Sequence, residues 1–313
     1  MNIEYHYHIT YLIAISAGFS VQDANKIAYS SQYVDDNLFE ISIYDNSKKN
    51  IFYKNQASAL KENSLHNTKI IKNTLIPFHF LPGKKASKRI DGKSHELTTT
   101  PNNKIAKRVL ITALKSKNLY WIGIASHAYV DTWAHQNFVG GFTNFNTMPN
   151  SIGNLLPNIG HAQAFDYPDL VGFIWEDLRL KRKKISNITR FLDASINLYT
   201  MYEKQKLEQV IGINDFIQLL HTTMLRYKSD NYIMIKLMIS SRIRDYNSLA
   251  KKISSIDIEQ YNSKKWLNKA ANFCTEQNRF YIQNSEDFHK SDWYQFQEAV
   301  KTHVKFIWKI LPI

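Results

Sequence analysis

Apolar residues recur at helical spacing along most of this chain. The first such segment runs from 8 to 17 and the second from 21 to 36, where Ser20 and Asp23 form a capping box at the helix start. The same periodicity predicts further helices at about 104–115, 119–138, 169–182, 187–206, 214–227, 230–252, 262–280 and 291–310. We therefore expect an all-α protein built as a multi-helix bundle.

Two stretches break this pattern. Residues 39–56 alternate apolar and polar positions around Asp45, Asn46 and Ser47, which predicts one small β-hairpin. Residues 141–168 contain three Gly and three Pro, which predicts an irregular loop. We place a metal-binding helical core at 1–184, and helices at 185–313 that pack on this core or continue it as one domain.

The stretch 123–140, GIASHAYVDTWAHQNFVG, combines apolar residues with metal-ligand side chains. It places His127, Asp131 and His135 at i, i+4 and i+8, so on a helix they lie within about 80° of one another. An unpaired buried charge is costly, and a bound cation is one of the few things that relieves this cost. The plain alternative is a half-exposed helix whose polar groups are hydrogen-bonded to their neighbours.

The spacing within this helix also bears on the number of metal ions. Residues four apart lie about 6 Å apart along the axis, so His127 and Asp131 can hold one ion. His127 and His135 lie about 12 Å apart and do not easily share one. We therefore favour more than one ion, with Asp131 as a bridge, an arrangement that other proteins use to hydrolyse phosphate esters.

Further candidate ligands lie outside this helix. They are His6, Asp35, Asp36, His79, His161, Asp166 and Asp169. Each has an ordinary structural alternative, such as a solvated helix end for the early Asp pair or a helix N-cap for Asp169. His6 and His8 point in different directions on a helix, and we choose His6 as the ligand. Taken together, these residues predict a metal site.

The charge balance favours anionic partners. Lys and Arg number 40 against 27 Asp and Glu, which suits nucleic acid, phospholipid headgroups or phosphorylated metabolites, or simply a soluble basic protein. The basic run from Lys181 to Lys184 is either a solvated helix end or a patch that steers phosphate. The single cysteine, Cys274, excludes an internal disulfide and multi-cysteine zinc ribbons.

The N-terminal stretch lacks a basic start, so we expect no signal peptide, and no apolar run is long enough for a membrane span. We therefore expect a protein that is cytoplasmic as synthesised. Export without a signal and peripheral contact with a membrane both stay open.

The candidate residues resemble a known ligand pattern. A His-x-x-x-Asp helix, a further His after it, a downstream His followed by an acid, an early Asp and an N-terminal His are similar to the all-α superfamily of zinc-dependent phospholipases C and single-strand-specific zinc nucleases. The runs YHYHITY, AYSSQYVDD, IPFHFLPG and GHAQAFDYPDL, with the central stretch, resemble a bacterial family of unknown function over roughly residues 1–180.

The superfamily resemblance implies two or three zinc ions, or other divalent metals. The implied ligands are His6, Asp36, His79, His127, Asp131, His135, His161 and Asp166, and Asp35 or Asp36 would orient the attacking water. Phe165 departs from the pattern, because the superfamily has Glu four residues after its last His and Asp166 would have to substitute for it. The superfamily also uses the amino group of its processed first residue as a metal ligand. This chain departs from that pattern as well, because Met1 lies five residues before His6.

The leading hypothesis is a zinc-dependent phosphoric ester hydrolase of phospholipase C-like type. In it a metal-bound hydroxide would attack an anionic phosphate-containing substrate, either a phospholipid or a nucleotide. The alternative is a non-catalytic binding or interaction protein in which the metal is structural. A helical phosphohydrolase built on an adjacent His-Asp doublet is disfavoured, because the sequence contains no such doublet.

Overall fold

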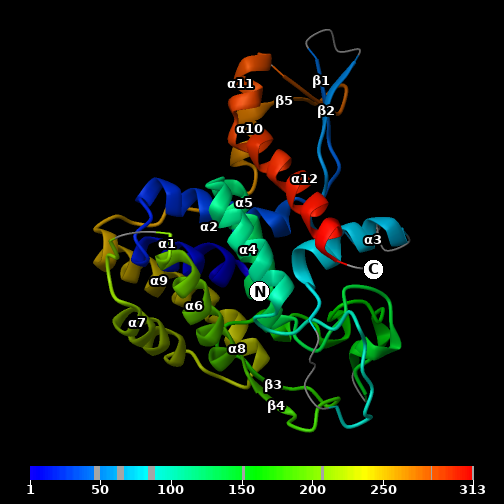
Figure 1. Ribbon diagram of the computed structural model, residues 1–313, viewed down its shortest axis with the longest axis vertical. Coiled ribbons are helices and arrows are strands. Elements are labelled where there is room, and N and C mark those ends of the chain that lie inside the picture. The colour runs from blue at the N-terminus through cyan, green and yellow to red at the C-terminus, as the bar shows by residue number, and fades with distance from the viewer. Residues whose placement is uncertain are drawn as a thin grey trace.

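The computed structural model describes residues 1–45, 50–61, 67–83, 89–149, 152–205, 208–282 and 284–311. This part of the chain is mostly helical with a few small strands (Figure 1). The α-helices are α1 (Thr10–Ser16), α2 (Val21–Asp36), α3 (Thr68–Thr74), α4 (Lys104–Ser116), α5 (Leu119–Ala134), α6 (Asn187–Glu203), α7 (Ile213–Leu225), α8 (Tyr232–Leu237), α9 (Ile239–Ser254), α10 (Lys265–Ala270), α11 (Ser285–Lys290) and α12 (Asp292–Ile310).

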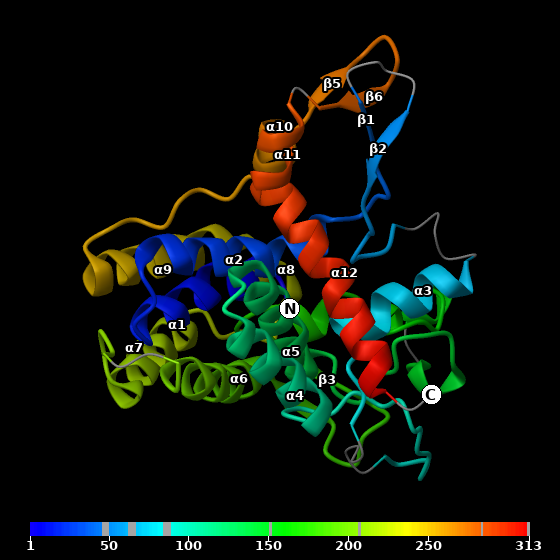
Figure 2. The same ribbon diagram turned by 45° about the horizontal axis from the view of Figure 1, so that its top comes forward.

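Helix α5 lies at the centre of the molecule and packs against α2, α4, α6 and α12 (Figures 1 and 2). Every residue from Trp121 to Ala134 is buried, as expected for a helix that is apolar all round. Its first turn is capped by Asn118, whose side chain accepts a hydrogen bond from the backbone N–H of Trp121 at 3.0 Å. The helix ends at Ala134, earlier than predicted, and therefore leaves His135 at its C-cap.

Close contact between α2 and α5 depends on a glycine. An ideal Cβ at Gly123 would lie 2.4 Å from the carbonyl oxygen of Ile27, so a larger residue would push the helices apart. The N-terminal end of α2 is fixed by the predicted capping box, in which Ser20 accepts from the N–H of Asp23 at 3.1 Å. This packing brings Asp35, near the C-terminal end of α2, to the middle of α5.

The predicted hairpin is present and belongs to a larger sheet. Strands β1 (Ser42–Tyr44) and β2 (Ile51–Lys54) pair antiparallel, while Asn46 and Ser47 of the predicted turn lie outside the described residues. β1 also pairs in parallel with β6 (Arg279–Tyr281), which pairs antiparallel with β5 (Asn272–Cys274). The sheet order is β2-β1-β6-β5, and the sheet projects from the helical body beside α10 and α11 (Figure 2).

Two predicted helices are wrong. Most of the helix expected at 169–182 is replaced by β3 (Ile174–Glu176), which pairs antiparallel with β4 (Lys184–Ser186). The helix expected at 262–280 stops after α10, where β5 and β6 begin. Gly172 has left-handed backbone (φ 82°) just before β3, and Asn278 (φ 51°) lies in the turn between β5 and β6; apolar spacing reveals neither.

The largest apolar core draws on both halves of the chain. It contains Leu12 and Ile124 from the first half together with Leu198 and Phe296 from the second. A smaller core, which includes Phe80, Phe138 and Trp175, lies under the 3-10 turns of residues 144–169 and the β3–β4 hairpin. Among the described helices, none combines the length and apolarity needed to cross a bilayer.

Candidate metal centre

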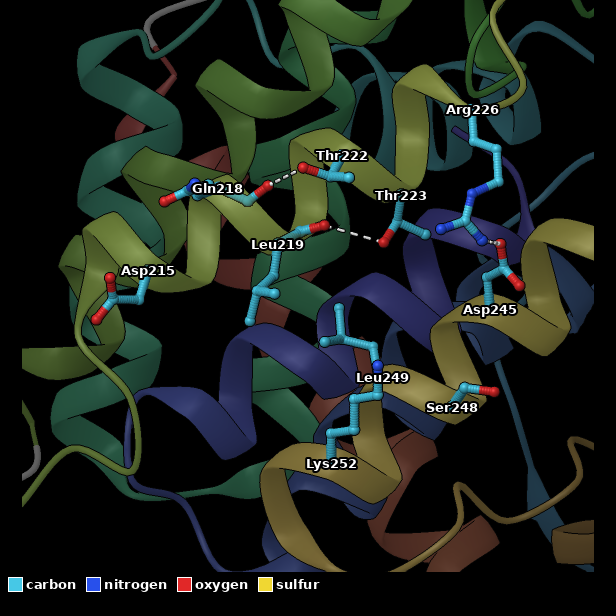
Figure 3. Close-up of a pocket in the computed structure, with 10 residues that line it drawn as sticks. All are labelled: Asp215, Gln218, Leu219, Thr222, Thr223, Arg226, Asp245, Ser248, Leu249 and Lys252. Atoms are coloured by element: carbon cyan, nitrogen blue, oxygen red, sulfur yellow. Dashed lines mark hydrogen bonds and ion pairs between the residues drawn. The ribbon is translucent and has the colours of Figure 1, made fainter.

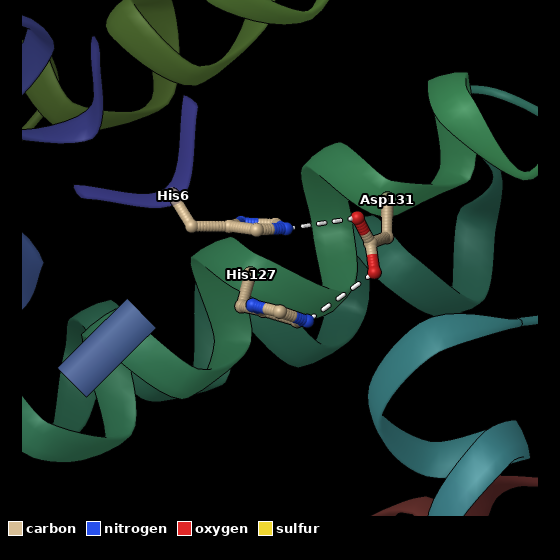
Figure 4. Close-up of side chains that lie close together, drawn as sticks. All are labelled: His6, His127 and Asp131. Atoms are coloured by element: carbon tan, nitrogen blue, oxygen red, sulfur yellow. Dashed lines mark ion pairs between the residues drawn. The ribbon is translucent and has the colours of Figure 1, made fainter. Parts of the chain in front are cut away.

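Asp131 is a buried carboxylate surrounded by histidines. Its side chain is 1% exposed. Oδ1 lies 3.1 Å from Nε2 of His6, and Oδ2 lies 3.2 Å from both Nδ1 of His79 and Nε2 of His127. Oδ2 is also 3.5 Å from Nδ1 of His135. The rings of His6 and His127 both point toward this carboxylate, although only His127 shares its helix (Figure 4).

His6 and His79 both lie on π-helical turns. These turns span Glu4–Ile9 and Leu75–His79. π-helical turns are rare and occur frequently at functional sites. The turn at Glu4–Ile9 allows the His6 ring to stack on the His127 ring, with 3.7 Å between ring centroids and an interplanar angle of 18°.

Four histidines share one hydrogen-bonding arrangement. In each, one ring nitrogen donates to a backbone carbonyl and the other faces a carboxylate. Nε2 of His79 donates to Ser58 (3.0 Å), Nδ1 of His127 to Ser31 (2.8 Å), Nδ1 of His135 to His79 (2.8 Å) and Nδ1 of His161 to Phe165 (2.7 Å). Metal-binding histidines usually donate their second ring nitrogen in this way, which fixes the tautomer and presents the other nitrogen as a ligand.

Asp169 completes the other side of the cluster. Its Oδ1 lies 2.9 Å from Nε2 of His135, and its Oδ2 lies 3.3 Å from Nε2 of His161. A 3-10 turn at Tyr167–Asp169 positions this carboxylate. His135 therefore bridges the two aspartates, since it is also in contact with Asp131.

Three sets of donor atoms are compact enough to hold a metal ion, with the atoms of each set within 4.8 Å of one another. The first set is His6, His127 and Asp131; the second is Asp35, His79 and His127; the third is His135, His161 and Asp169. Imidazole nitrogen and carboxylate oxygen are both ordinary zinc ligands. His127 and His135 fall in different sets, in agreement with the axial distance between i and i+8.

One edge of the cluster reaches solvent. The side chain of Asp35 is 31% exposed, that of His161 is 21% exposed and that of Asp169 is 14% exposed. The side chains of His6, His127 and Asp131, by contrast, are at most 1% exposed. A small molecule could therefore approach from the side of Asp35, His161 and Asp169.

The charges of the buried groups depend on one another. Burial alone would raise the pKa of Asp131, but its electrostatic interactions with His135, the Met1 amino group and His127 hold that pKa well below its usual value. Burial lowers the pKa of His6 well below its usual value, and its interactions with His127 and the amino group add to this effect. Asp131 is therefore an anion and His6 a neutral imidazole, the forms in which both residues bind metals.

The amino group of Met1 lies inside the cluster. Its nitrogen is 2.5 Å from Oδ1 of Asp131 and 3.1 Å from Oδ1 of Asp169. Burial alone would lower its pKa, but the charges of Asp131, Asp169 and Asp35 raise it to about 11. In this structure the amino group is a cation that lies between the two aspartates. We did not expect this contact, because Met1 lies five residues before His6.

The structure does not bring every proposed ligand into the three sets. The carboxylate of Asp36 accepts hydrogen bonds from Tyr261 (2.6 Å) and Gln32 (3.1 Å). Asp166 forms an ion pair with Lys236 at 2.6 Å. Asp35 and Asp36 differ by about 100° around the helix, so only one of them can face α5.

Asp169 is the residue that our choice of ligands omitted. It was a candidate whose ordinary alternative was a helix N-cap, but the helix expected after it is absent. Asp166 and Asp169 both follow His161 in an irregular segment, where helical periodicity offers no means of choosing between them. His6 lies in the first donor set, whereas His8 lies in none of the three.

Fold and site together define a mostly helical protein with a buried histidine–aspartate cluster that opens to solvent along one edge. The chain belongs to the Family of unknown function (DUF6765), whose model matches residues 1–311. No curated protein and no solved structure matches it.

Proposed function

We propose that this protein is a metal-dependent hydrolase of phosphate esters that binds two zinc ions. The observation that carries this proposal is the set of contacts around Asp131, where one carboxylate meets four imidazoles in the interior. The Met1 ammonium pairs with Asp131 and Asp169, whereas the lone pairs of the neutral imidazoles around these carboxylates would be satisfied by a metal ion. Zinc accepts this combination of nitrogen and oxygen donors.

The ring nitrogens of His6 support the fit to a metal. Nδ1 has no hydrogen-bond partner among the described residues, and Nε2 lies 3.1 Å from Asp131 without hydrogen-bonding geometry. A fully buried imidazole with unsatisfied nitrogens is expected where a ligand takes the place of a hydrogen bond. Nδ1 of His127 donates to Ser31, so only one of its ring nitrogens is free and the first and second donor sets cannot both hold an ion. The first and third sets would hold two ions, with Asp131 in the first set and 3.5 Å from His135 of the third.

A cation held in these sets would supply Lewis acidity toward a phosphate oxygen and would make water more acidic near neutral pH. Asp35 is placed to accept a proton from that water. Its carboxylate lies at the solvent edge, 3.6 Å from Nε2 of His127 and 3.8 Å from Nδ1 of His79. Burial raises its pKa despite the charges of these two histidines, which brings it closer to the range of an effective general base.

The open edge favours catalysis over a purely structural metal. Structural zinc sites are closed by four protein ligands, whereas catalytic sites keep a position for water or substrate. Here Asp35, His161 and Asp169 each retain contact with solvent. Asp169 also contacts His161, so it can provide the acidic ligand for which the zinc phospholipase C-like pattern uses a Glu.

Metal content is the first test. Protein purified without added metal should contain at least one zinc ion, or a similar divalent ion, per chain by elemental analysis. Asp131→Asn should lose most of it, because the amide removes the charge that the four histidines share. The matched control is Asp215→Asn, a carboxylate on exposed α7. Less than one ion per chain in the wild-type protein would end the proposal.

Two adjacent aspartates provide the test of catalysis. Hydrolysis of bis(p-nitrophenyl) phosphate should fall about 100-fold or more in kcat for Asp35→Asn, the loss typical of a missing general base. Asp36→Asn makes the same chemical change one residue away and should remain close to wild type, because Asp36 faces Tyr261. A panel of choline phospholipids and single-stranded DNA then separates the two substrate classes. Wild-type protein that is loaded with zinc yet hydrolyses none of these substrates would favour a structural metal.

A further inference from the structure

An open cavity of about 680 Å³ lies at the β3–β4 hairpin. Five cationic residues contribute to its lining: Lys181, Arg182, Lys184, Arg190 and Lys228. No Asp or Glu lines it. Its size falls within the range of small-molecule sites, so it suits a compact ligand better than an extended chain.

The cations of this cavity form no direct ion pair with the described part of the chain, although the charge of Asp177 acts on Arg190 from a longer distance. None of the five cations lies within 4.0 Å of a carboxylate in the described part of the chain. The nearby acid Asp177 forms a two-pronged ion pair with Arg179, at 2.9 and 2.8 Å. Glu176 lies opposite Lys184 in the hairpin register, but the two side chains do not form an ion pair.

Another groove of this protein contains acidic as well as basic side chains. The groove lies between α7 and α9 and has a volume of about 480 Å³ (Figure 3). Its lining contains Arg226 and Lys252 but also Asp215 and Asp245, and Arg226 pairs with Asp245 at 2.6 Å. The cavity at the hairpin has no such balance.

The backbone adds to the positive potential of the cavity. Helix α6 begins at Asn187, and Ser186 and Thr189, at its N-terminal end, line the cavity. The N–H of Asn187 donates to the carbonyl of Phe173 at 3.0 Å, and the Ser186 side chain makes no capping hydrogen bond to the N–H groups that follow in the first turn. Arg190 extends from the same turn and donates to the carbonyl of Ala134 at 3.4 Å, which anchors its guanidinium at the cavity wall. Helix N-termini and arginine side chains both favour phosphate groups.

We propose that this cavity binds a multiply charged phosphate group, carried by a soluble phosphorylated molecule or by a lipid headgroup. Five unpaired cations and a helix N-terminus converge on a cavity of ligand size, and a single monovalent anion would leave most of this charge unneutralised. The assignment does not depend on the metal centre. It gives the basic run at Lys181–Lys184 a role as part of a pocket.

The test uses the full chain and inorganic tripolyphosphate, titrated by calorimetry. Lys184→Gln with Lys228→Gln removes two exposed cations from the cavity, and binding should weaken about tenfold or more. The matched control, Lys251→Gln with Lys290→Gln, removes the same charge from exposed sites elsewhere and should bind like wild type. His127→Ala should keep the affinity of wild type, since that variant alters only the metal centre.

A second arm separates the two sources of phosphate. The wild-type protein and the cavity variant are co-sedimented with phosphatidylcholine vesicles that contain phosphatidylinositol bisphosphate. A lipid headgroup is supported if the wild-type protein binds these vesicles and the cavity variant does not. A soluble ligand is supported if the wild-type protein binds tripolyphosphate but not the vesicles. The proposal fails if the cavity variant binds tripolyphosphate as tightly as its control, or if His127→Ala alone abolishes binding. It also fails if the cavity variant binds single-stranded RNA more weakly than the control does but binds tripolyphosphate as tightly as the control.

Discussion

The buried ion pair between Glu4 and Arg242 holds the N-terminal segment against α9. Both side chains are 0% exposed, and the guanidinium donates to the carboxylate through Nε at 2.5 Å and Nη2 at 2.9 Å. Nη2 also donates to the carbonyl of Ile235 at 3.0 Å. Glu4 is two residues from His6, so this pair also positions one side of the metal centre.

Arg242→Met should therefore destabilise the protein strongly. It leaves the Glu4 carboxylate buried without its cation, and loss of one partner of such a pair costs about 3–5 kcal/mol. The assay is urea unfolding in the presence of a chelator, so that metal binding does not contribute to the free energy of unfolding. Glu4→Met combined with Arg242→Met removes both charges and should recover most of the loss, because an apolar pair of similar volume is often tolerated.

An exposed pair provides the control. Arg226 and Asp245 lie 2.6 Å apart, but the Arg226 side chain is 58% exposed, so Arg226→Met should cost at most about 1 kcal/mol. With zinc restored, Arg242→Met should also bind less metal than wild type. If Arg242→Met costs no more than Arg226→Met, or if the double variant is as unstable as the sum of its single changes, the Glu4–Arg242 pair does not act as described.

Three further predictions concern the cluster and its supporting helices. His127 belongs to the first two donor sets and His161 to the third, so His127→Ala and His161→Ala should each lose about one zinc ion per chain in elemental analysis, and the double variant about two. Burial lowers the pKa of His303 to about 4, with the charge of His127 adding to the effect, so this residue is neutral in the folded protein. An unfolded histidine takes up its proton near pH 6.5, so the folded state should lose ~3 kcal/mol as the pH falls from about 6.5 to about 4, and His303→Gln should lose less over the same range in urea unfolding. Gly123→Ala would place a Cβ 2.4 Å from the carbonyl oxygen of Ile27 and should cost about 1–3 kcal/mol in the same assay, although alanine ordinarily favours a helix.

Each of these predictions has a result that would contradict it. Loss of all zinc in either single histidine variant would mean that the donor sets do not act separately. Parallel pH profiles for wild type and His303→Gln would remove the assigned role of that histidine. A Gly123→Ala protein at least as stable as wild type would show that the contact between α2 and α5 tolerates a methyl group.

The sequence by itself determines which helix carries the chemistry. The apolar character of residues 119–134 requires burial, and the four-residue spacing of His127 and Asp131 places both on one face whatever surrounds them. The i+8 spacing of His127 and His135 likewise separates them into different donor sets. The capping box at Ser20 and the hairpin in residues 39–56 are also local features, and both were predicted from sequence.

Only the tertiary structure decides which distant residues join this helix. The π-helical turns that direct His6 and His79 toward Asp131 have no recognisable signal in the apolar pattern. The choice of Asp169 over Asp166 follows from the path of an irregular segment, whose direction is set by packing and by left-handed backbone at Phe165 (φ 52°). Periodicity describes one helix at a time, whereas a cluster assembled from separate segments depends on contacts between residues far apart in the chain.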